Sequence, residues 1–301
     1  MTRSKMHPDQ VHTDPGLLRR LLGEQFPQWA DLPIVEVSSY GTDHDIYRLG
    51  EDLVARLPKI GWATQQAAKE KRWLSVLAPH LPLMVPVHVA MGHPGEGYPF
   101  EWSIHAWLPG HPASDGLNDL DQAATDLAAF IMALRDVDTT GAPERTLGAR
   151  GAPLIEKNDD FFRASLEQLG NRIDRRSVLD LWESALAAPA WQGEEVWVHG
   201  DLLPGNLLVR DDRLSAVIDW GGLNVGDPAC DLQPAWNVFT RSSRETFRSA
   251  LGGVDKASWL RGRGWVVYQA VAALAYYRET NPGMVRQASH ALAEVLADGS
   301  G

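Results

Sequence analysis

Residues 196–206, with the sequence VWVHGDLLPGN, decide the fold and the candidate site of this chain. The apolar residues before His199 predict a buried strand, and residues 207–209 predict a second strand. Between these strands, Asp201 and Asn206 fall on one tight loop turned by a Pro-Gly pair. A carboxylate can accept a proton or orient a hydroxyl group, and an amide oxygen can bind a hard cation. The loop alone is also compatible with an ordinary capped turn, in which both side chains bond to their own backbone.

A second acidic position, Asp219, favours the reactive interpretation over the capped turn. Two aspartates at 211–212 predict a hairpin that returns the chain towards Asn206, so Asp219 should lie near that amide. One carboxylate and one amide oxygen can hold Mg²⁺ when phosphate oxygens complete the coordination shell. Asp201 would then stand beside a bound phosphate, which is the layout that phosphoryl transfer needs.

Length and composition describe an ordinary globular protein. The chain has 301 residues, of which 44% are hydrophobic and 22% are charged, enough for one large domain or two lobes. Its single cysteine, Cys230, rules out an internal disulfide, and residues 1–16 show no apolar leader, so a cytoplasmic location is expected. The longest mostly apolar run, residues 265–277, is too short to span a membrane.

The net charge of −11 disfavours a nucleic-acid partner. Residues 1–108 contribute 10 − 12 = −2 and residues 109–301 contribute 18 − 27 = −9, so the second part is the acidic one. An acidic surface would attract a cationic small molecule, although it could equally serve only to keep the protein soluble.

The hydrophobic pattern changes along the chain and predicts two domains. Short strands with tight turns are predicted at 34–40, 46–49, 53–57 and 100–108, with helices from Asp14-Pro15 and over 62–78. After Pro109-Gly110, helices are predicted at 121–135, 158–168, 177–187, 231–239, 244–251, 259–278 and after Pro282. The break places the expected boundary between residues 1–108 and residues 109–301.

Two charged residues of the first part stand where apolar ones are expected. Arg56 interrupts a predicted strand that is otherwise apolar. Glu70 lies on the apolar face of the predicted helix, because the residues three before it and four and seven after it are apolar. Because a buried charge is costly unless it is paired, we predict that Arg56 and Glu70 form an ion pair. The alternative is an arginine that reaches solvent and a glutamate at the edge of its stripe.

The pattern H-G-D-x-x-x-x-N followed by I-D-x-G resembles the catalytic loop and metal-binding motif of the kinase-like phosphotransferases. Residues 195–232 are most similar to the aminoglycoside phosphotransferase family, and a looser resemblance covers about residues 34–280. The resemblance implies an α+β, bilobal protein-kinase-like fold. Residues 1–108 would form a nucleotide-binding N-lobe with an antiparallel sheet and a helix, and residues 109–301 a mainly helical C-lobe for catalysis and acceptor binding.

The resemblance also implies roles for individual residues. Asp201 would be the catalytic base or would orient the hydroxyl, and Asn206 and Asp219 would bind Mg²⁺. Further residues matching the family's nucleotide site are the loop residues Gly41 and Thr42, the pair Arg56 and Glu70, and the hinge residues His105, Ala106, Trp107 and Leu108. Residues matching positions that brace the loop or approach the substrate are Asp227, Asp231 and His199.

The chain departs from the family pattern at three places. Arg56 replaces the usual phosphate-binding lysine, the phosphate loop has a single glycine, and Trp220 replaces a phenylalanine. An arginine stays charged and makes forked contacts, and neither of the first two changes abolishes the expected chemistry. Both changes leave the affinity for the phosphate donor and the preference between ATP and GTP open.

The expected activity is transfer of the γ-phosphate of ATP or GTP, with Mg²⁺, to a hydroxyl group of a small molecule. A polycationic aminoglycoside suits the acidic second part, which would make the activity one of antibiotic resistance. The alternatives are a macrolide, which the abundant aromatic residues would suit, a cationic peptide antibiotic, and an amino alcohol or sugar. A nucleotide-binding module without catalysis is the non-enzyme alternative, against which the intact set Asp201, Asn206 and Asp219 argues.

Two other kinds of site are disfavoured by the sequence. The histidine pairs His88 with His93 and His105 with His111 lack zinc-ligand spacing. The sequence contains no G-x-S-x-G, the motif that carries the nucleophilic serine of many hydrolases, so nothing in it indicates a serine hydrolase.

Overall fold

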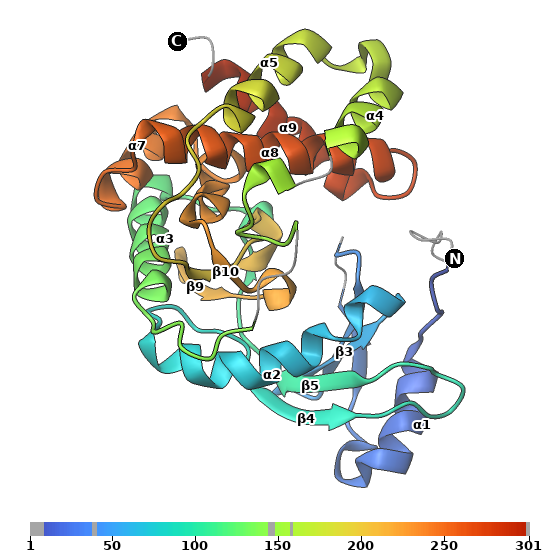
Figure 1. Ribbon diagram of the computed structural model, residues 1–301. Helices are drawn as coiled ribbons and strands as arrows, with labels where there is room; N and C mark the ends of the chain where they lie inside the picture. The colour runs from blue at the N-terminus through green and yellow to red at the C-terminus, as the bar shows by residue number, and fades with distance from the viewer. Residues whose placement is uncertain (1–8, 38–40, 144–147, 157–158, 299–301) are drawn as a thin grey trace. The chain divides into compact units, whose positions relative to one another are not determined.

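The computed structural model describes residues 9–37, 41–143, 148–156 and 159–298. The chain divides into two compact units, which we describe separately (Figure 1). The first unit comprises Met1–Pro79 with Met84–Pro109, and the second comprises His80–Leu83 with Gly110–Gly301. The first holds an antiparallel sheet with helices and the second is mainly helical, as the α+β prediction requires.

The sheet of the first unit has five strands in the order β1-β2-β3-β5-β4, with every neighbouring pair antiparallel. The strands are β1 (Ile34–Glu36), β2 (His44–Leu49), β3 (Leu53–Pro58), β4 (His88–Gly92) and β5 (Trp102–Ala106). The strand predicted over 34–40 is shorter, and positions 38–40 lie outside the described residues. The strand predicted over 100–108 ends at Ala106, because its partner β3 begins opposite, at Leu53.

Helix α1 (Pro15–Gln25) covers one face of this sheet. Asp14 caps the helix by accepting a hydrogen bond from the Leu17 N–H at 2.7 Å. Fully burying one leucine is worth about 1.5–3 kcal/mol, so the apolar stripe of α1 is a main source of stability here. The shared core contains Leu17, Leu18, Leu21 and Leu22 of α1 and Tyr47, Leu49, Ala55, Leu57, Trp102 and Ile104 of the sheet.

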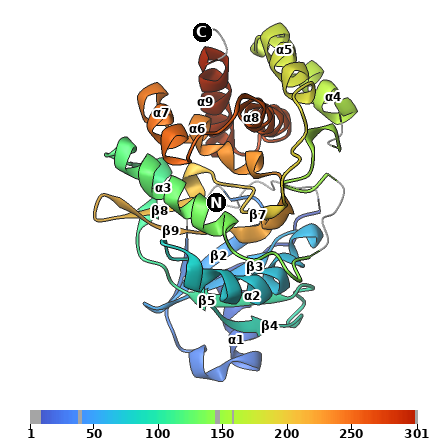
Figure 2. The ribbon, with the colours of Figure 1, turned by 60° about the vertical axis from the view of Figure 1, so that its left-hand side comes forward.

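Helix α2 (Gln66–Leu77) lies on the opposite face of the sheet from α1 (Figure 2). The predicted helix over 62–78 starts four residues late, because a short 3₁₀ turn at Gly61–Ala63 precedes it. Strand alternation sends Ala55 and Leu57 to the α1 face, and Arg56 between them therefore points to the α2 face.

The second unit contains seven described helices, α3 (Leu120–Arg135), α4 (Asp159–Leu169), α5 (Arg175–Leu186), α6 (Pro234–Asn237), α7 (Arg241–Ala250), α8 (Lys256–Tyr276) and α9 (Pro282–Asp298). The helix predicted over 231–239 is wrong. A 3₁₀ turn (Pro228–Leu232) and the four-residue α6 occupy this stretch, because Pro234 has no N–H to continue a helix. The first residue of the helix predicted over 158–168, Asn158, lies outside the described residues.

Two small sheets in the second unit carry the motif residues. Strand β7 (Val196–Val198) pairs with β10 (Asn224–Gly226), and β8 (Leu207–Arg210) pairs with β9 (Arg213–Val217) and with β6 (His111–Pro112). The predicted hairpin turn is confirmed at Asp211 and Asp212, whose φ angles of 52° and 59° suit a tight two-residue turn. Strand β10 was not predicted, since three residues are too few to show a period.

In the part of the chain that the structure describes, no helix is both long and apolar enough to cross a membrane.

Candidate active site

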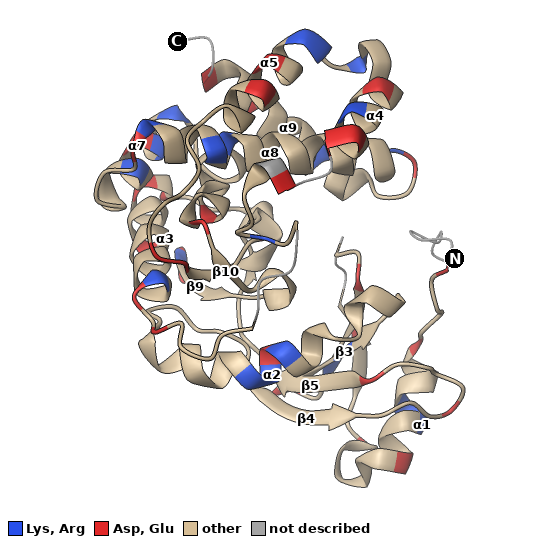
Figure 3. Ribbon diagram, in the orientation of Figure 1, with Lys and Arg blue, Asp and Glu red and all other residues tan. Residues whose placement is uncertain are grey.

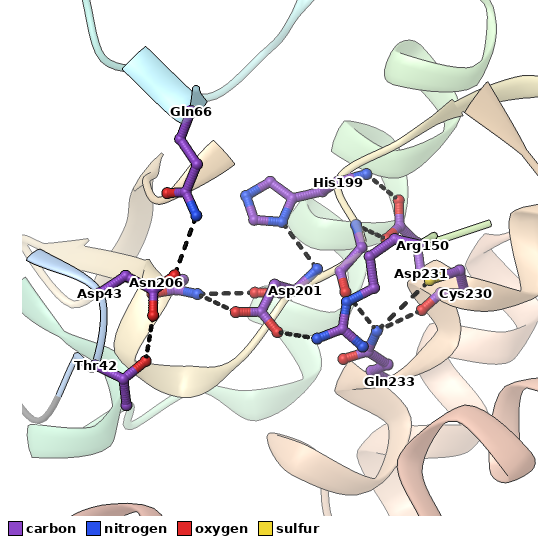
Figure 4. A network of polar contacts seen from close by, with 11 residues as sticks. Thr42, Asp43, Gln66, Arg150, His199, Asp201, Asn206, Cys230, Asp231 and Gln233 are labelled. Atoms are coloured by element: carbon purple, nitrogen blue, oxygen red, sulfur yellow. Dashed lines mark hydrogen bonds and ion pairs between the residues drawn. The ribbon is translucent and has the colours of Figure 1, made fainter. Parts of the chain in front are cut away.

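The loop after β7 brings Asp201 and Asn206 into contact (Figure 4). The Asn206 amide nitrogen donates to the Asp201 main-chain oxygen at 2.9 Å and to its Oδ2 at 3.3 Å. Gly200 allows the sharp exit from β7, with a φ of 79° that favours glycine. The carboxylate and amide therefore lie side by side at the end of a buried strand.

His199 ties this loop to the end of β9. Its Nδ1 accepts a hydrogen bond from the Asp201 N–H at 3.2 Å. Because that nitrogen is an acceptor, the proton of a neutral imidazole sits on Nε2, which donates to the Ile218 carbonyl at 3.2 Å. The buried ring also packs edge-on against Trp220, with ring centroids 4.6 Å apart. These contacts are those of a residue that braces the loop.

Asp231 fixes the main chain immediately before Asp201. Its carboxylate accepts the N–H groups of His199 at 2.8 Å and Gly200 at 2.7 Å. Burial raises the pKa of Asp231 to about 6, against the two amide hydrogen bonds and the charge of Arg135, which lower it. The side chain is held entirely within the fold, being 1% exposed.

Asp227 lies in a buried ion pair with Arg261. The distances are 2.6 Å from Nε to Oδ2 and 3.2 Å from Nη2 to Oδ1. Oδ1 also accepts the Ala229 N–H at 2.9 Å. The resemblance implies that Asp227 either braces the loop or approaches the substrate. These contacts are those of a bracing residue.

Asp219 follows directly on a residue that is paired with Asn206. The Ile218 N–H donates to the Asn206 carbonyl at 2.9 Å, so the hairpin returns the chain as the spacing indicates. Asp219 has φ 62° and ψ 70°, a left-handed conformation that is uncommon for a non-glycine residue. Such positions cost of order 1 kcal/mol and cluster at functional sites.

The donor set of Asn206 and Asp219 fits Mg²⁺. Because the Asn206 nitrogen faces Asp201, the amide oxygen points away from that carboxylate and is suited to a cation. One amide oxygen and one carboxylate are hard ligands, and Mg²⁺ commonly takes its remaining ligands from water and substrate phosphates.

In the first unit, the predicted ion pair is confirmed. Arg56 Nη1 lies 2.5 Å from Glu70 Oε2, and the two side chains are 11% and 0% exposed. The neighbouring loop is held by a contact of its own and by one from the residue after β3, since Thr42 donates to Asp43 at 3.0 Å and Lys59 donates to the Gly41 carbonyl at 3.4 Å. The structure thus brings Arg56 and Glu70 together as a fixed unit.

We expect Arg56→Met to lower the free energy of unfolding by about 3–5 kcal/mol, because it leaves the Glu70 carboxylate in a buried position without its cation. Glu70→Gln should destabilise less, and the double variant Arg56→Met/Glu70→Gln should recover most of the loss. Urea unfolding of the four proteins measures this coupling. Additive effects in the double variant would contradict it.

Two backbone N–H groups of the predicted hinge, residues 105–108, are already hydrogen-bonded to neighbouring segments of the first unit. The Ala106 N–H donates to the Val87 carbonyl at 2.9 Å, and the Trp107 N–H donates to the Asp52 carbonyl at 2.7 Å. Neither N–H is available to a purine in this conformation, so the expected nucleotide contact falls to other backbone groups of residues 105–108. The ring of Trp107 packs under the Arg48 guanidinium, 4.8 Å from its centroid.

His105 is buried as a neutral side chain. Its Nε2 lies 3.0 Å from the Ser103 hydroxyl and its ring is 5.5 Å from that of His88. Burial, then the charge of Arg56 and then His88, lower the pKa of His105 from 6.5 to about 3. Its imidazole therefore resists protonation at pH values where an unfolded chain takes up a proton.

This shift predicts acid sensitivity of the fold. Between about pH 6.5 and pH 3 the unfolded chain binds a proton that folded His105 does not, so stability should fall with pH by up to about 1.4 kcal/mol per unit. His105→Asn should reduce that slope, measured by urea unfolding at pH 7, 6 and 5. Equal slopes in wild type and His105→Asn would contradict the prediction.

Sequence reasoning missed several polar residues that bond to the candidate site or to the residues that brace it. Arg150 lies in a stretch without periodicity, and Gln233 and Gln269 are single amides in apolar surroundings. Arg261 stands in a short Arg-Gly-Arg run that gave no sign of a buried partner. No local signal marks any of them, because their partners are distant in the sequence.

A sequence model described as the phosphotransferase enzyme family matches residues 35–265 of this chain. The uncharacterized protein YcbJ of Bacillus subtilis is 26% identical over 198 residues, which is 63% of this chain. The homoserine kinase of Granulibacter bethesdensis is 28% identical over 169 residues, or 54% of this chain. The chain spans 58% and 44% of the length of these two relatives.

Solved structures share the fold over almost the whole chain. The GDP complex of aminoglycoside 2'-phosphotransferase-IIIa has a TM-score of 0.73 at 19% identity, covering 95% of this chain and 100% of its own. The macrolide 2'-phosphotransferase of Brachybacterium faecium has a TM-score of 0.57 at 26% identity, covering 93% and 97%. The predicted bilobal kinase-like fold class is therefore confirmed.

Proposed function

Because the chain belongs to the phosphotransferase enzyme family, we propose that it transfers the γ-phosphate of ATP or GTP to a hydroxyl group of a small molecule. One observation carries the proposal: the Asp201 carboxylate, the Asn206 amide and the turn of Asp219 meet at the ends of paired strands in one unit. A general base beside a magnesium site is what this reaction requires.

In the proposed reaction, the acceptor oxygen forms a bond to the γ-phosphorus as the bond from that phosphorus to the bridging oxygen breaks. Asp201 takes the hydroxyl proton, and the nucleoside diphosphate leaves with the bridging oxygen. Asn206 and Asp219 would hold Mg²⁺, which neutralises phosphate charge when it is bound. His199 and Asp231 keep the loop in place.

In this proposal, residues 1–108 hold the nucleotide. Arg56 would contact the phosphates with its orientation fixed by Glu70, and Gly41 and Thr42 would cover them. The residues 105–108 would meet the purine. Residues 109–301 would carry catalysis and the acceptor. A cytoplasmic location belongs to this proposal, because nucleoside triphosphates are available there.

An aminoglycoside is the first proposed acceptor, which would make antibiotic resistance the biological role. The support is the −9 charge of residues 109–301. This is a net charge, from which the arginines that pair with carboxylates, Arg213, Arg244 and Arg261, are already subtracted. Figure 3 shows both signs of charge on α4 and α5. A net negative charge attracts a cationic acceptor.

A macrolide is the second candidate, and exposed aromatic rings favour it. Phe161 on α4 is 45% exposed, with its ring 6.4 Å from that of Tyr268 on α8. Tyr276 near the end of α8 is 49% exposed. Aromatic rings suit a large, partly apolar acceptor better than a polyhydroxylated cation.

The test is transfer of labelled γ-phosphate from ATP and GTP, with Mg²⁺, to kanamycin, gentamicin, streptomycin, erythromycin and homoserine. We expect a phosphorylated antibiotic, formed about 10²–10⁴-fold more slowly by Asp201→Asn. Phosphorylation of homoserine alone would refute the charge argument for the acceptor. Tight nucleotide binding without transfer to any compound would instead favour a binding module.

A further inference from the structure

We infer that Arg150 is a positioning residue for Asp201, an inference that rests on the phosphotransferase function proposed above. Arg150 Nη2 lies 3.5 Å from Asp201 Oδ1, on the opposite side of the carboxylate from the Asn206 amide (Figure 4). The two side chains are 28% and 27% exposed, so the pair is partly shielded from water. The carboxylate thus lies between an amide and a guanidinium, both of which donate hydrogen bonds to it.

A glycine makes room for the stem of Arg150 in the loop that carries Asp201, and the stem also touches the turn that carries Asp219. A β-carbon at Gly200 would lie 2.5 Å from Cβ and 2.6 Å from Cγ of Arg150. A β-carbon at Gly222, beyond Asp219, would lie 3.5 Å from the same Cγ and 2.7 Å from the His199 carbonyl. The stem therefore packs against the turn that carries Asp201 and the turn that carries Asp219.

The main chain next to Arg150 is fixed as well. The Gly151 carbonyl accepts the Asp227 N–H at 2.8 Å, and Gly151 has a φ of 77°. A β-carbon at Gly226 would collide with that carbonyl. The segment therefore packs tightly against the end of β10, which fixes the main-chain position from which the Arg150 side chain extends.

Two glutamines connect the guanidinium back to the loop. With its amide oxygen facing Arg150, Gln269 accepts from Nη2 at 3.2 Å and from Nη1, and its nitrogen donates to Gln233 Oε1 at 2.8 Å. Gln233 Nε2 in turn donates to the Gly200 carbonyl at 3.0 Å. A series of hydrogen bonds therefore runs from Arg150 through Gln269 and Gln233 to Gly200, the residue before Asp201.

This arrangement has a chemical consequence for a general base. A guanidinium bonded to one oxygen and an amide bonded to the other restrict rotation of the carboxylate, so the base is correctly aimed when the hydroxyl arrives. Arginine suits the position because its planar fork contacts a carboxylate and an amide at once. Removing it should slow the chemical step without weakening nucleotide binding.

The first test compares Arg150→Gln, Arg150→Lys and wild type with the panel acceptor that wild type phosphorylates best. We expect Arg150→Gln to lower kcat about 10-fold, less than the 10²–10⁴-fold of a lost general base, with KM for the nucleotide within about twofold. Arg150→Lys, which keeps the positive charge, should recover part of the loss of kcat. Arg213→Gln, which removes an arginine paired with Asp126, is the matched control and should behave as wild type.

The second test does not need an acceptor. Crystal structures of wild type and Arg150→Gln should show the Asp201 carboxylate turned away from its wild-type position, or divided between two positions, in Arg150→Gln. An unchanged position of that carboxylate overturns the inference even if phosphate transfer is found. A raised KM with unchanged kcat would show that Arg150 binds substrate instead, and equal losses of kcat and Tm in the Gln and Lys variants would show a purely structural role. Inactivity of wild type with every acceptor, beside a displaced Asp201 carboxylate in Arg150→Gln, refutes the proposed function and leaves the Arg150–Asp201 coupling standing.

Discussion

Asp201→Asn should lower kcat by about 10²–10⁴-fold, the usual effect of losing a general base. Asparagine keeps the size of the side chain and an oxygen that can accept from the Asn206 amide, which now donates to Oδ2 at 3.3 Å. The fold and the nucleotide affinity should therefore be preserved. Steady-state phosphate transfer gives kcat, and calorimetric titration with nucleotide and Mg²⁺ gives Kd.

Asp211→Asn is the matched control for this variant. Asp211 lies on the adjacent hairpin turn with its side chain 90% exposed, and its φ of 52° is one that asparagine tolerates. The control should keep full activity. If Asp201→Asn also keeps nearly full kcat, Asp201 is not the base and the mechanism proposed above is wrong.

The parts of the site that local periodicity determines were predictable from the sequence. Alternation along β3 and the helical spacing of α2 turn Arg56 and Glu70 towards each other, so their pairing follows from two simple rules. Asn206 and Asp219 are joined by a short hairpin whose length sets where the chain returns. In each case a few neighbouring residues carry the information.

Contacts between distant segments were not predictable. Arg150 is separated from Asp201 by 51 positions and from Gln269 by more, and it sits in a stretch without a period. The buried partner of Asp231 is the main chain of residues 199–200, and main-chain donors leave no trace in a sequence. The occupied N–H groups of Ala106 and Trp107 depend on strand register, which the apolar pattern alone does not give.

Asp219→Asn should reduce kcat by at least about 10²-fold and raise the Mg²⁺ concentration needed for half-maximal activity. The backbone explains why asparagine is the informative replacement. Asp219 has a φ of 62°, and asparagine is one of the few residues that adopts this conformation readily. The variant therefore removes a negative ligand while keeping the turn between β9 and Trp220.

The Mg²⁺ dependence separates this variant from Asp201→Asn. A lost general base lowers kcat at every Mg²⁺ concentration, whereas a lost metal ligand lowers activity most at low Mg²⁺. Manganese, which prefers the same oxygen ligands but binds more tightly, should restore part of the activity of Asp219→Asn and little of that of Asp201→Asn. An unchanged Mg²⁺ requirement in Asp219→Asn would show that its strained backbone serves the turn alone, and the metal site would have to be sought around Asn206 and other oxygen ligands.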